Sequence, residues 1–229
     1  MASNWEDLNA RGISAIVMVI VGAFDVYMGG IWFHFLVMFA TGVMIWELWS
    51  MIAPSRTTGA MLMAVATVAI LSVQIEEQNE ILPFLFLIIP AIGAVLLKKL
   101  RVAFFFYALA IIIAGFALVV FRDQFGALWI LWLLLVVIAS DVLGYFAGRT
   151  FGGPKFWPAI SPKKTWSGTV AGWIGAGVVG LVFAMFTEAS MILVPLSMLL
   201  SFAGQLGDIA ESAIKRRTGV KDSSNLIPG

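Results

Sequence analysis

The end of the chain, from Pro195 to Gly229, joins an apolar helix to a group of charged side chains. Polar residues recur there every three or four positions, which places them on one helical face: Ser201, Gln205, Asp208, Ser212 and Lys215. Carboxylate and cationic groups therefore meet on that face. Because the helix begins as a membrane-like segment, where a carboxylate costs roughly 2.5 to 3.5 kcal/mol, the polar face indicates a function.

A second polar face begins where an earlier apolar run, from Leu128 to Ala139, ends. Its members again repeat at helical spacing: Ser140, Asp141, Gly144, Tyr145, Gly148 and Arg149. Asp141 is expected to lie a turn or two inside the membrane boundary. A carboxylate at that depth favours a functional role over the alternative, a structural salt bridge.

Between the two polar faces lies the segment RTFGGPKFWPAISPKKTWS, residues 149 to 167. Its glycines and prolines exclude a single regular element. Lysines beside serine and threonine suit a polyphosphate, because cations neutralise its charge while hydroxyls and free backbone N–H groups add hydrogen bonds. The alternative is a basic loop that only touches anionic lipid.

Composition sets the class of protein. Of the 229 residues, 61% are hydrophobic and 12% are charged, against about 25% charged in a soluble domain. The sequence therefore predicts an integral membrane protein. The net charge of +1 gives no argument for a nucleic-acid partner. With no cysteine and one histidine, His34, the chain has no disulfide, no Cys-ligated zinc, no Cys nucleophile and no His-based metal cluster or triad.

The apolar runs are long enough to span a membrane and predict an all-α fold with about eight transmembrane helices, at 12–29, 31–52, 59–75, 81–97, 102–121, 125–147, 167–187 and 191–209. Pro90 is expected to kink the fourth. We divide the chain into a helical scaffold, residues 1–125, and a catalytic membrane region, residues 126–229, with a loop at 148–166.

The distribution of charge predicts the orientation. A cytoplasmic N-terminus leaves Arg122 as the only one of the 14 lysines and arginines on the outer side. The loop at 148–166 and the C-terminal charged segment then both face the cytoplasm. In the seventh helix, small residues recur every four positions, which predicts close packing against the sixth or the eighth helix: Gly168, Gly172, Ala176 and Gly180.

Several spaced motifs resemble one family. The segment from Ser212 to Arg216, followed after four residues by Lys221-Asp222 and later by Pro228, is similar to the opening of the phosphatidate cytidylyltransferase signature. That family is also called the CDP-diacylglycerol synthases. The resemblance continues upstream in the Ser140-Asp141 region and its GYFAGR run, in SPKKTWSG from Ser161, in GQLGD ending at Asp208, in Arg11 to Ala15 and in Trp46-Glu47.

The resemblance implies transfer of CMP from CTP to phosphatidate, with Mg²⁺ as cofactor and with CTP, phosphatidate and the lipid bilayer as partners. It implies a multi-pass protein of the inner (plasma) membrane with its active site facing the cytoplasm. Asp208 would be the metal ligand, Lys215, Arg216 and Lys221 would hold phosphates, and Asp222 would orient the phosphates or the metal. Ser161, Lys163, Lys164 and Thr165 would contact nucleotide or lipid phosphate, and we add Asp141 to the catalytic residues and Ser212 to the substrate-binding ones. A monovalent cation beside magnesium and a homodimer stay open.

The sequence departs from the family pattern at its end. The family continues with His-Gly-Gly, two residues and Asp-Arg, whereas this sequence stops at Gly229. We therefore expect a truncated chain that lacks a second metal-binding carboxylate, a ninth helix in the intact protein, and no activity in the chain as written. The alternative functions are a CTP-dependent transferase for another lipid phosphate, an ion-coupled transporter using Asp141 and Asp208, and a catalytically dead homologue.

Overall fold

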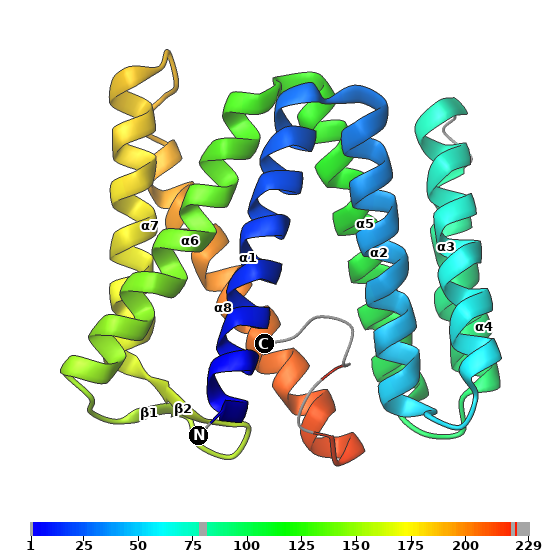
Figure 1. The fold of residues 1–229 in the computed structure, drawn as a ribbon. Helices are drawn as coiled ribbons and strands as arrows, with labels where there is room; N and C mark the ends of the chain where they lie inside the picture. The colour runs from blue at the N-terminus through cyan, green and yellow to red at the C-terminus, as the bar shows by residue number, and fades with distance from the viewer. Residues whose placement is uncertain (1, 78–81, 221–222, 224–229) are drawn as a thin grey trace. The chain divides into compact units, whose positions relative to one another are not determined.

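The structure is a computed structural model that describes residues 2–77, 82–220 and 223, with side chains for residues 12–75, 84–220 and 223. Its elements are α1 Ala2–Met28, α2 Gly30–Ile52, α3 Thr57–Glu77, the 3-10 helix η1 Leu82–Leu87, α4 Ile88–Leu96, α5 Arg101–Phe125, α6 Ala127–Thr150, β1 Lys155–Trp157, β2 Ser161–Thr165, α7 Trp166–Phe186 and α8 Leu193–Thr218 (Figure 1). Every predicted apolar run coincides with a helix. The prediction of an all-α fold is confirmed, with one short β-hairpin added.

Among the described residues, six helices are long and apolar enough to cross a membrane: α2, α3, α5, α6, α7 and α8. Two shorter apolar helices cover Gly12–Met28 and Phe84–Leu96. The chain is therefore a multi-pass membrane protein. That all eight helices span the bilayer, and that the N-terminus is cytoplasmic, stay predictions.

The helix predicted at 81–97 is built differently from the expectation. It begins as η1 and becomes α-helical only at Ile88, so Pro90 is the third residue of α4. In the first turn of an α-helix, the N–H that proline lacks would have no partner within the helix. Pro90 therefore lies near the start of the α-helical part, and the kink there stays a prediction.

The chain divides into two compact units, and the first contains α1 to α5. Its α2 packs against α1, α3 and α5 and buries Ile45, Leu48 and Trp49. The Trp49 ring meets Phe104 of α5 edge to face, with ring centroids 5.7 Å apart. Aromatic pairs of this geometry add to the stabilisation from burial alone.

Arg122 of α5 closes the C-terminal end of α1. Its Nε and Nη2 atoms donate to the carbonyl oxygen of Val26 at 3.0 and 2.8 Å. Gly29 follows with φ at 64°, and a Cβ there would lie 2.6 Å from Arg122 Nη2, so only glycine fits. The one basic residue predicted on the outer side is thus a cap for the last carbonyls of a helix, where a cation is favourable.

The second unit, Leu128–Gly219, contains most of α6, the hairpin, α7 and α8. The small residues of α7 allow close approach on two sides. A Cβ at Gly168 would lie 2.5 Å from the carbonyl oxygen of Gly144 in α6, and one at Gly180 would lie 2.6 Å from that of Leu193 in α8. The predicted packing of α7 is confirmed, and it involves both α6 and α8.

The hairpin of β1 and β2 lies in the segment that we expected to contain no single regular element, and it joins the end of α6 to the start of α7 (Figure 1). Its strands are antiparallel, with Lys155 opposite Thr165 and Trp157 opposite Ser161. The first pair of partners is separated from the second by two positions in β1 but by four in β2, so β2 contains an irregularity. The Phe156 and Trp166 rings pack with centroids 4.6 Å apart and tie the hairpin to the start of α7.

Candidate active site

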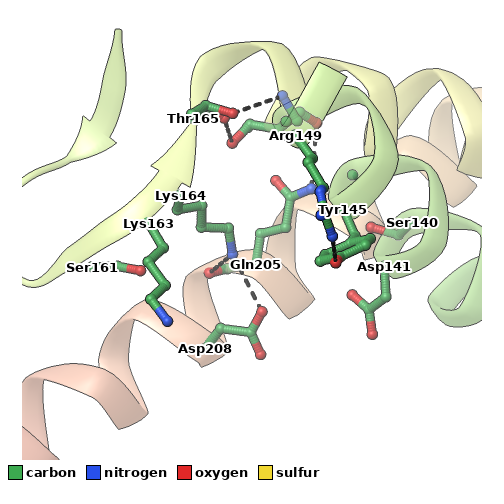
Figure 2. Close-up of a pocket in the computed structure, with 14 residues that line it drawn as sticks. Ser140, Asp141, Tyr145, Arg149, Ser161, Lys163, Lys164, Thr165, Gln205 and Asp208 are labelled. Atoms are coloured by element: carbon green, nitrogen blue, oxygen red, sulfur yellow. Dashed lines mark hydrogen bonds and ion pairs between the residues drawn. The ribbon is translucent and has the colours of Figure 1, made fainter. Parts of the chain in front are cut away.

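A pocket of about 420 Å³ lies within the second unit, between the hairpin and the adjoining parts of α6, α7 and α8 (Figure 2). Its wall consists mainly of polar side chains and glycines: Ser140, Asp141, Gly144, Tyr145, Gly148, Arg149, Ser161, Lys163, Lys164, Thr165, Gly168, Thr169, Gln205 and Asp208. The two polar faces read from the sequence therefore meet in one pocket.

The pocket brings together six of the predicted site residues: Asp141, Ser161, Lys163, Lys164, Thr165 and Asp208. Three others, Ser212, Lys215 and Arg216, belong to α8 but do not line the pocket. The predicted phosphate ligand Lys221 and its neighbour Asp222 lie outside the described residues.

The irregularity of β2 decides what the hairpin presents to the pocket. In a regular strand, consecutive side chains point to opposite faces. Here Lys163 and Lys164 are consecutive and both line the pocket, and Figure 2 shows both side chains extending from β2 toward α8. A bulge re-aims side chains in this way, and it doubles the positive charge that one short strand supplies.

Lys164 and Asp208 connect the hairpin to α8. The Lys164 ammonium lies 3.2 Å from Asp208 Oδ2 and also donates to the carbonyl oxygen of Gln205 at 3.1 Å. The Lys164 side chain is 20% exposed, whereas that of Asp208 is 66% exposed. The ion pair holds the lysine in the wall and leaves much of the Asp208 carboxylate accessible.

Gln205 joins α7 to α8 at the wall of the pocket, and our sequence analysis assigned it no role. It is buried; its Oε1 accepts a hydrogen bond from Trp173 Nε1 at 3.0 Å, and its Nε2 donates to the carbonyl oxygen of Thr169 at 3.3 Å. Its backbone oxygen also accepts from Lys164, so this turn of α8 helps to hold the lysine. The place of Gln205 on the predicted polar face of 201–215 was the only sequence signal.

Two buried hydroxyl contacts join α6 to α8. Ser140 Oγ and Ser201 Oγ are 2.6 Å apart, and Trp132 Nε1 donates to Ser197 Oγ at 3.1 Å. Interhelical hydrogen bonds of this kind contribute about 0.6 kcal/mol each on average in membrane proteins. Their effect here is to fix the α6 wall of the pocket against α8.

Asp141 is the second carboxylate of the pocket. It is exposed and forms no hydrogen bond or ion pair with any residue in the described part of the chain. Figure 2 shows Asp141 and Asp208 on neighbouring walls, from α6 and α8. Two carboxylates and two lysines thus share one cavity.

Thr165 has a structural task besides lining the pocket. Its hydroxyl accepts a hydrogen bond from the backbone N–H of Gly168 at 3.2 Å and so caps the N-terminus of α7. It also lies 3.1 Å from Ser167 Oγ. Contact between Thr165 and a substrate stays a prediction.

Lys215 continues the polar face of α8 beyond the pocket. It lies seven residues after Asp208, which at 1.5 Å per residue is about 10 Å along the helix on nearly the same side. Its ammonium lies 2.8 Å from Glu211 Oε1, one turn earlier. Lys215 therefore lies outside the pocket, about two turns after Asp208 toward the C-terminal end of α8.

Tyr145 and Arg149 line the pocket from α6 and were not among the predicted site residues. Arg149 Nη1 donates to the Tyr145 hydroxyl at 2.8 Å, one helical turn away. The signal was present in the sequence, because both residues belong to the polar face that begins at Ser140. Only the acidic member of that face, Asp141, was selected.

The donor set fits a magnesium site only if a phosphate completes it. Among the described residues, no group of three or more histidine, cysteine, aspartate and glutamate side chains is placed to hold a metal. The pocket offers the two carboxylates of Asp141 and Asp208. Mg²⁺ typically binds one or two carboxylates and takes its remaining ligands from substrate phosphates and water, so these residues are compatible with it.

Comparison with known proteins gives one consistent result. The model of the cytidylyltransferase family matches residues 9–229. A phosphatidate cytidylyltransferase of Brucella abortus (biovar 1, strain 9-941) is 32% identical over 232 residues, which cover 98% of this chain and 86% of that protein. A protein of the same name from Staphylococcus saprophyticus is 40% identical over 130 residues, which cover 56% of this chain and 50% of that protein. Another from Bacillus subtilis is 39% identical over 110 residues, which cover 47% of this chain and 41% of that protein.

Proposed function

We propose that this chain, which belongs to the cytidylyltransferase family, transfers CMP from CTP to phosphatidate and releases pyrophosphate, so that CDP-diacylglycerol stays in the membrane. The observation that carries the proposal is the pocket at the end of apolar helices, in which Asp141 and Asp208 face Lys163 and Lys164. A site that holds two polyanions needs cations to neutralise their phosphates, and it needs carboxylates to hold a metal ion that shares this task.

The chemistry asks little of a general base. The phosphate monoester of phosphatidate is already anionic near neutral pH; its oxygen forms a bond to the α-phosphorus of CTP while the bond from that phosphorus to the pyrophosphate oxygen breaks. The work of the protein is to hold two anions together and to stabilise charge on the leaving pyrophosphate. Lys163 and Lys164 are placed to neutralise phosphate oxygens.

The sequence led us to expect the second metal-binding carboxylate beyond Gly229; in this proposal Asp141, which lines the pocket with Asp208, takes that place. Asp208 and Asp141 would hold Mg²⁺, which would neutralise phosphate charge and orient the leaving group. Release of Lys164 from Asp208 would free its ammonium for a phosphate. Lys215 and Arg216 would contact a phosphate that extends beyond the pocket, and Ser212 lies on the same face of α8 between them and Asp208. The cytoplasmic face of the inner membrane is the proposed location, since the distribution of lysine and arginine favours a cytoplasmic side for both basic segments.

The test is incorporation of labelled CTP into lipid by the native protein in membranes, with phosphatidate supplied. Asp208→Asn should lower turnover at least about a hundredfold, because a metal ion supplies several kcal/mol and each 1.36 kcal/mol is tenfold in rate. Glu188→Gln is the matched control, since Glu188 is an exposed acid of the loop after α7.

Turnover of Asp208→Asn within a few-fold of the wild type would contradict the metal assignment. Labelled product with another lipid phosphate but not with phosphatidate would support the other transferase. No labelled lipid with either substrate, from protein that is folded, would refute the proposed function. The family match favours the transferase over the transporter.

A further inference from the structure

Arg149 is a cation of the pocket that no carboxylate neutralises among the described residues. Within the described part of the chain, Arg149 Nη1 donates to the Tyr145 hydroxyl at 2.8 Å. A guanidinium carries five N–H donors, so most of them are available to a ligand. Arg149 therefore differs from Lys164, whose ammonium is already paired with Asp208.

The position of Arg149 in α6 orients its guanidinium. Arg149 lies in the last turn of α6, where the unpaired carbonyls of the helix end favour a cation. The Tyr145 hydroxyl fixes the guanidinium from one turn away, and the Tyr145 ring packs edge to face on Phe146 at 5.5 Å between centroids. Such a held fork can donate two parallel hydrogen bonds to one phosphate group.

The same face of α6 leads from Arg149 into the apolar part of the helix. Ile138, Val142, Tyr145 and Arg149 follow each other at spacings of four, three and four residues, which is one helical stripe. Ile138, Val142 and Tyr145 are 54%, 46% and 59% exposed. The stripe is about 16 Å long at 1.5 Å per residue, so an acyl chain lying along it would have its polar end at Arg149.

The opposite wall has a different character. Lys163 and Lys164 belong to the hairpin, which follows the end of the apolar helix, and both face the pocket (Figure 2). The pocket therefore has two cationic walls. Arg149 on α6 is continuous with an apolar helix surface, whereas Lys163 and Lys164 belong to the hairpin, outside the spanning helices.

We propose that Arg149, held by Tyr145, binds the phosphate monoester of the lipid substrate, whereas Lys163 and Lys164 bind the phosphates of the nucleotide. This inference rests on the proposed function. It assigns a lipid-phosphate subsite to α6. The exposed side chains of Ile138 and Val142 lie on the same helical stripe, further into the apolar part of the helix. Tyr145 is a positioning residue, because it acts through the guanidinium that it holds.

The test is the dependence of initial rate on each substrate, with the native protein in phosphatidylcholine nanodiscs. Phosphatidate is varied as a mole fraction at saturating CTP, and CTP is varied at saturating phosphatidate. Arg149→Gln should raise the KM for phosphatidate about tenfold or more and change the KM for CTP less than about twofold, because a charge-assisted bidentate contact to one substrate is lost. Lys163→Gln should show the reverse pattern.

Three further variants sharpen the comparison. Arg149→Lys should lie between wild type and Arg149→Gln, since it keeps the charge but loses the fork. Tyr145→Phe should raise the KM for phosphatidate in the same direction by a smaller factor. Lys155→Gln removes an equal charge from exposed β1 outside the pocket lining and should change neither KM.

An unchanged KM for phosphatidate in Arg149→Gln, or an equal or larger rise in the KM for CTP, would overturn the subsite. Retention of labelled phosphatidate by the immobilised protein in detergent, without CTP, separates this inference from the proposed function. If the wild type makes no CDP-diacylglycerol, the proposed function fails, while greater retention by wild type than by Arg149→Gln still supports the subsite. Equal retention overturns it.

Discussion

Replacing Gly168 by alanine tests whether the close contact of α6 with α7 sets the geometry of the pocket. The new Cβ would lie 2.5 Å from the carbonyl oxygen of Gly144, whereas ordinary contacts begin at 3.4 Å. The two nearest atoms, Gly144 O and Gly148 Cα, belong to the backbone of α6, so no side-chain rotation can relieve the contact. The helices must separate by about 0.9 Å at this point, and α6 carries Asp141 and Arg149 with it.

The expected cost follows from that displacement. Overpacking a tight contact typically costs about 1–3 kcal/mol, and the higher helix propensity of alanine returns up to about 1 kcal/mol. We expect a net loss of roughly 1–2 kcal/mol in the free energy of unfolding. Turnover should fall more steeply, by about a hundredfold, because a shift near 1 Å between reacting groups can have that effect.

Thermal unfolding in detergent, followed by tryptophan fluorescence, and labelled-CTP incorporation measure the two effects. Gly177→Ala is the matched control in the same helix. Its Cβ would lie 3.2 Å from Met198 Cγ, at a flexible side chain that can move, so stability and turnover should stay close to wild type. If Gly168→Ala unfolds and turns over like the wild type, the contact between α6 and α7 does not determine the pocket.

Further predictions concern three other features. Gln205→Leu leaves the Trp173 indole N–H without its acceptor, which should cost about 1–3 kcal/mol and lower the unfolding temperature; an unchanged melting curve would contradict the role of the network. Arg122→Gln removes the cap of α1 and should destabilise the first unit by about 1–2 kcal/mol, measured by denaturation in detergent, whereas an unaltered transition would show that the cap is dispensable. In sealed inside-out vesicles, an impermeant thiol reagent should label Ala159→Cys but not Ser190→Cys, since these exposed positions lie at opposite ends of α7; labelling of both would refute the predicted topology.

The helices could be predicted because hydrophobicity is a local property of the sequence. Each apolar run became a helix, and the four-residue repeat of small residues in α7 correctly indicated close packing. The apolar run predicted at 191–209 covers only part of α8, which continues to Thr218; the helical spacing from Ser201 to Lys215 indicated the rest. The last turns of α8 are polar, and hydropathy alone does not follow a helix beyond the apolar region.

The partners of the polar residues could not be predicted in the same way. Helical spacing indicates which residues share a face, and it placed Gln205 and Arg149 on the two polar faces. It does not show which side chain lies opposite on another helix, so the contact of Gln205 with Trp173 and that of Ser140 with Ser201 came only from the structure. The cost of a carboxylate in a membrane singled out Asp141 and Asp208 on these faces, whereas a neutral amide such as Gln205 gave no comparable signal.

The two additional positions in β2 make the length of the hairpin a determinant of the charge inside the pocket. In a strand with regular alternation, Lys163 and Lys164 would point to opposite faces, and only one ammonium would reach the cavity. A deletion in this strand could therefore halve its contribution without removing any lysine from the protein. Relatives that keep both lysines but differ in the number of residues between Trp157 and Thr165 need not bind phosphate alike, and counting basic residues in the loop would overlook the difference.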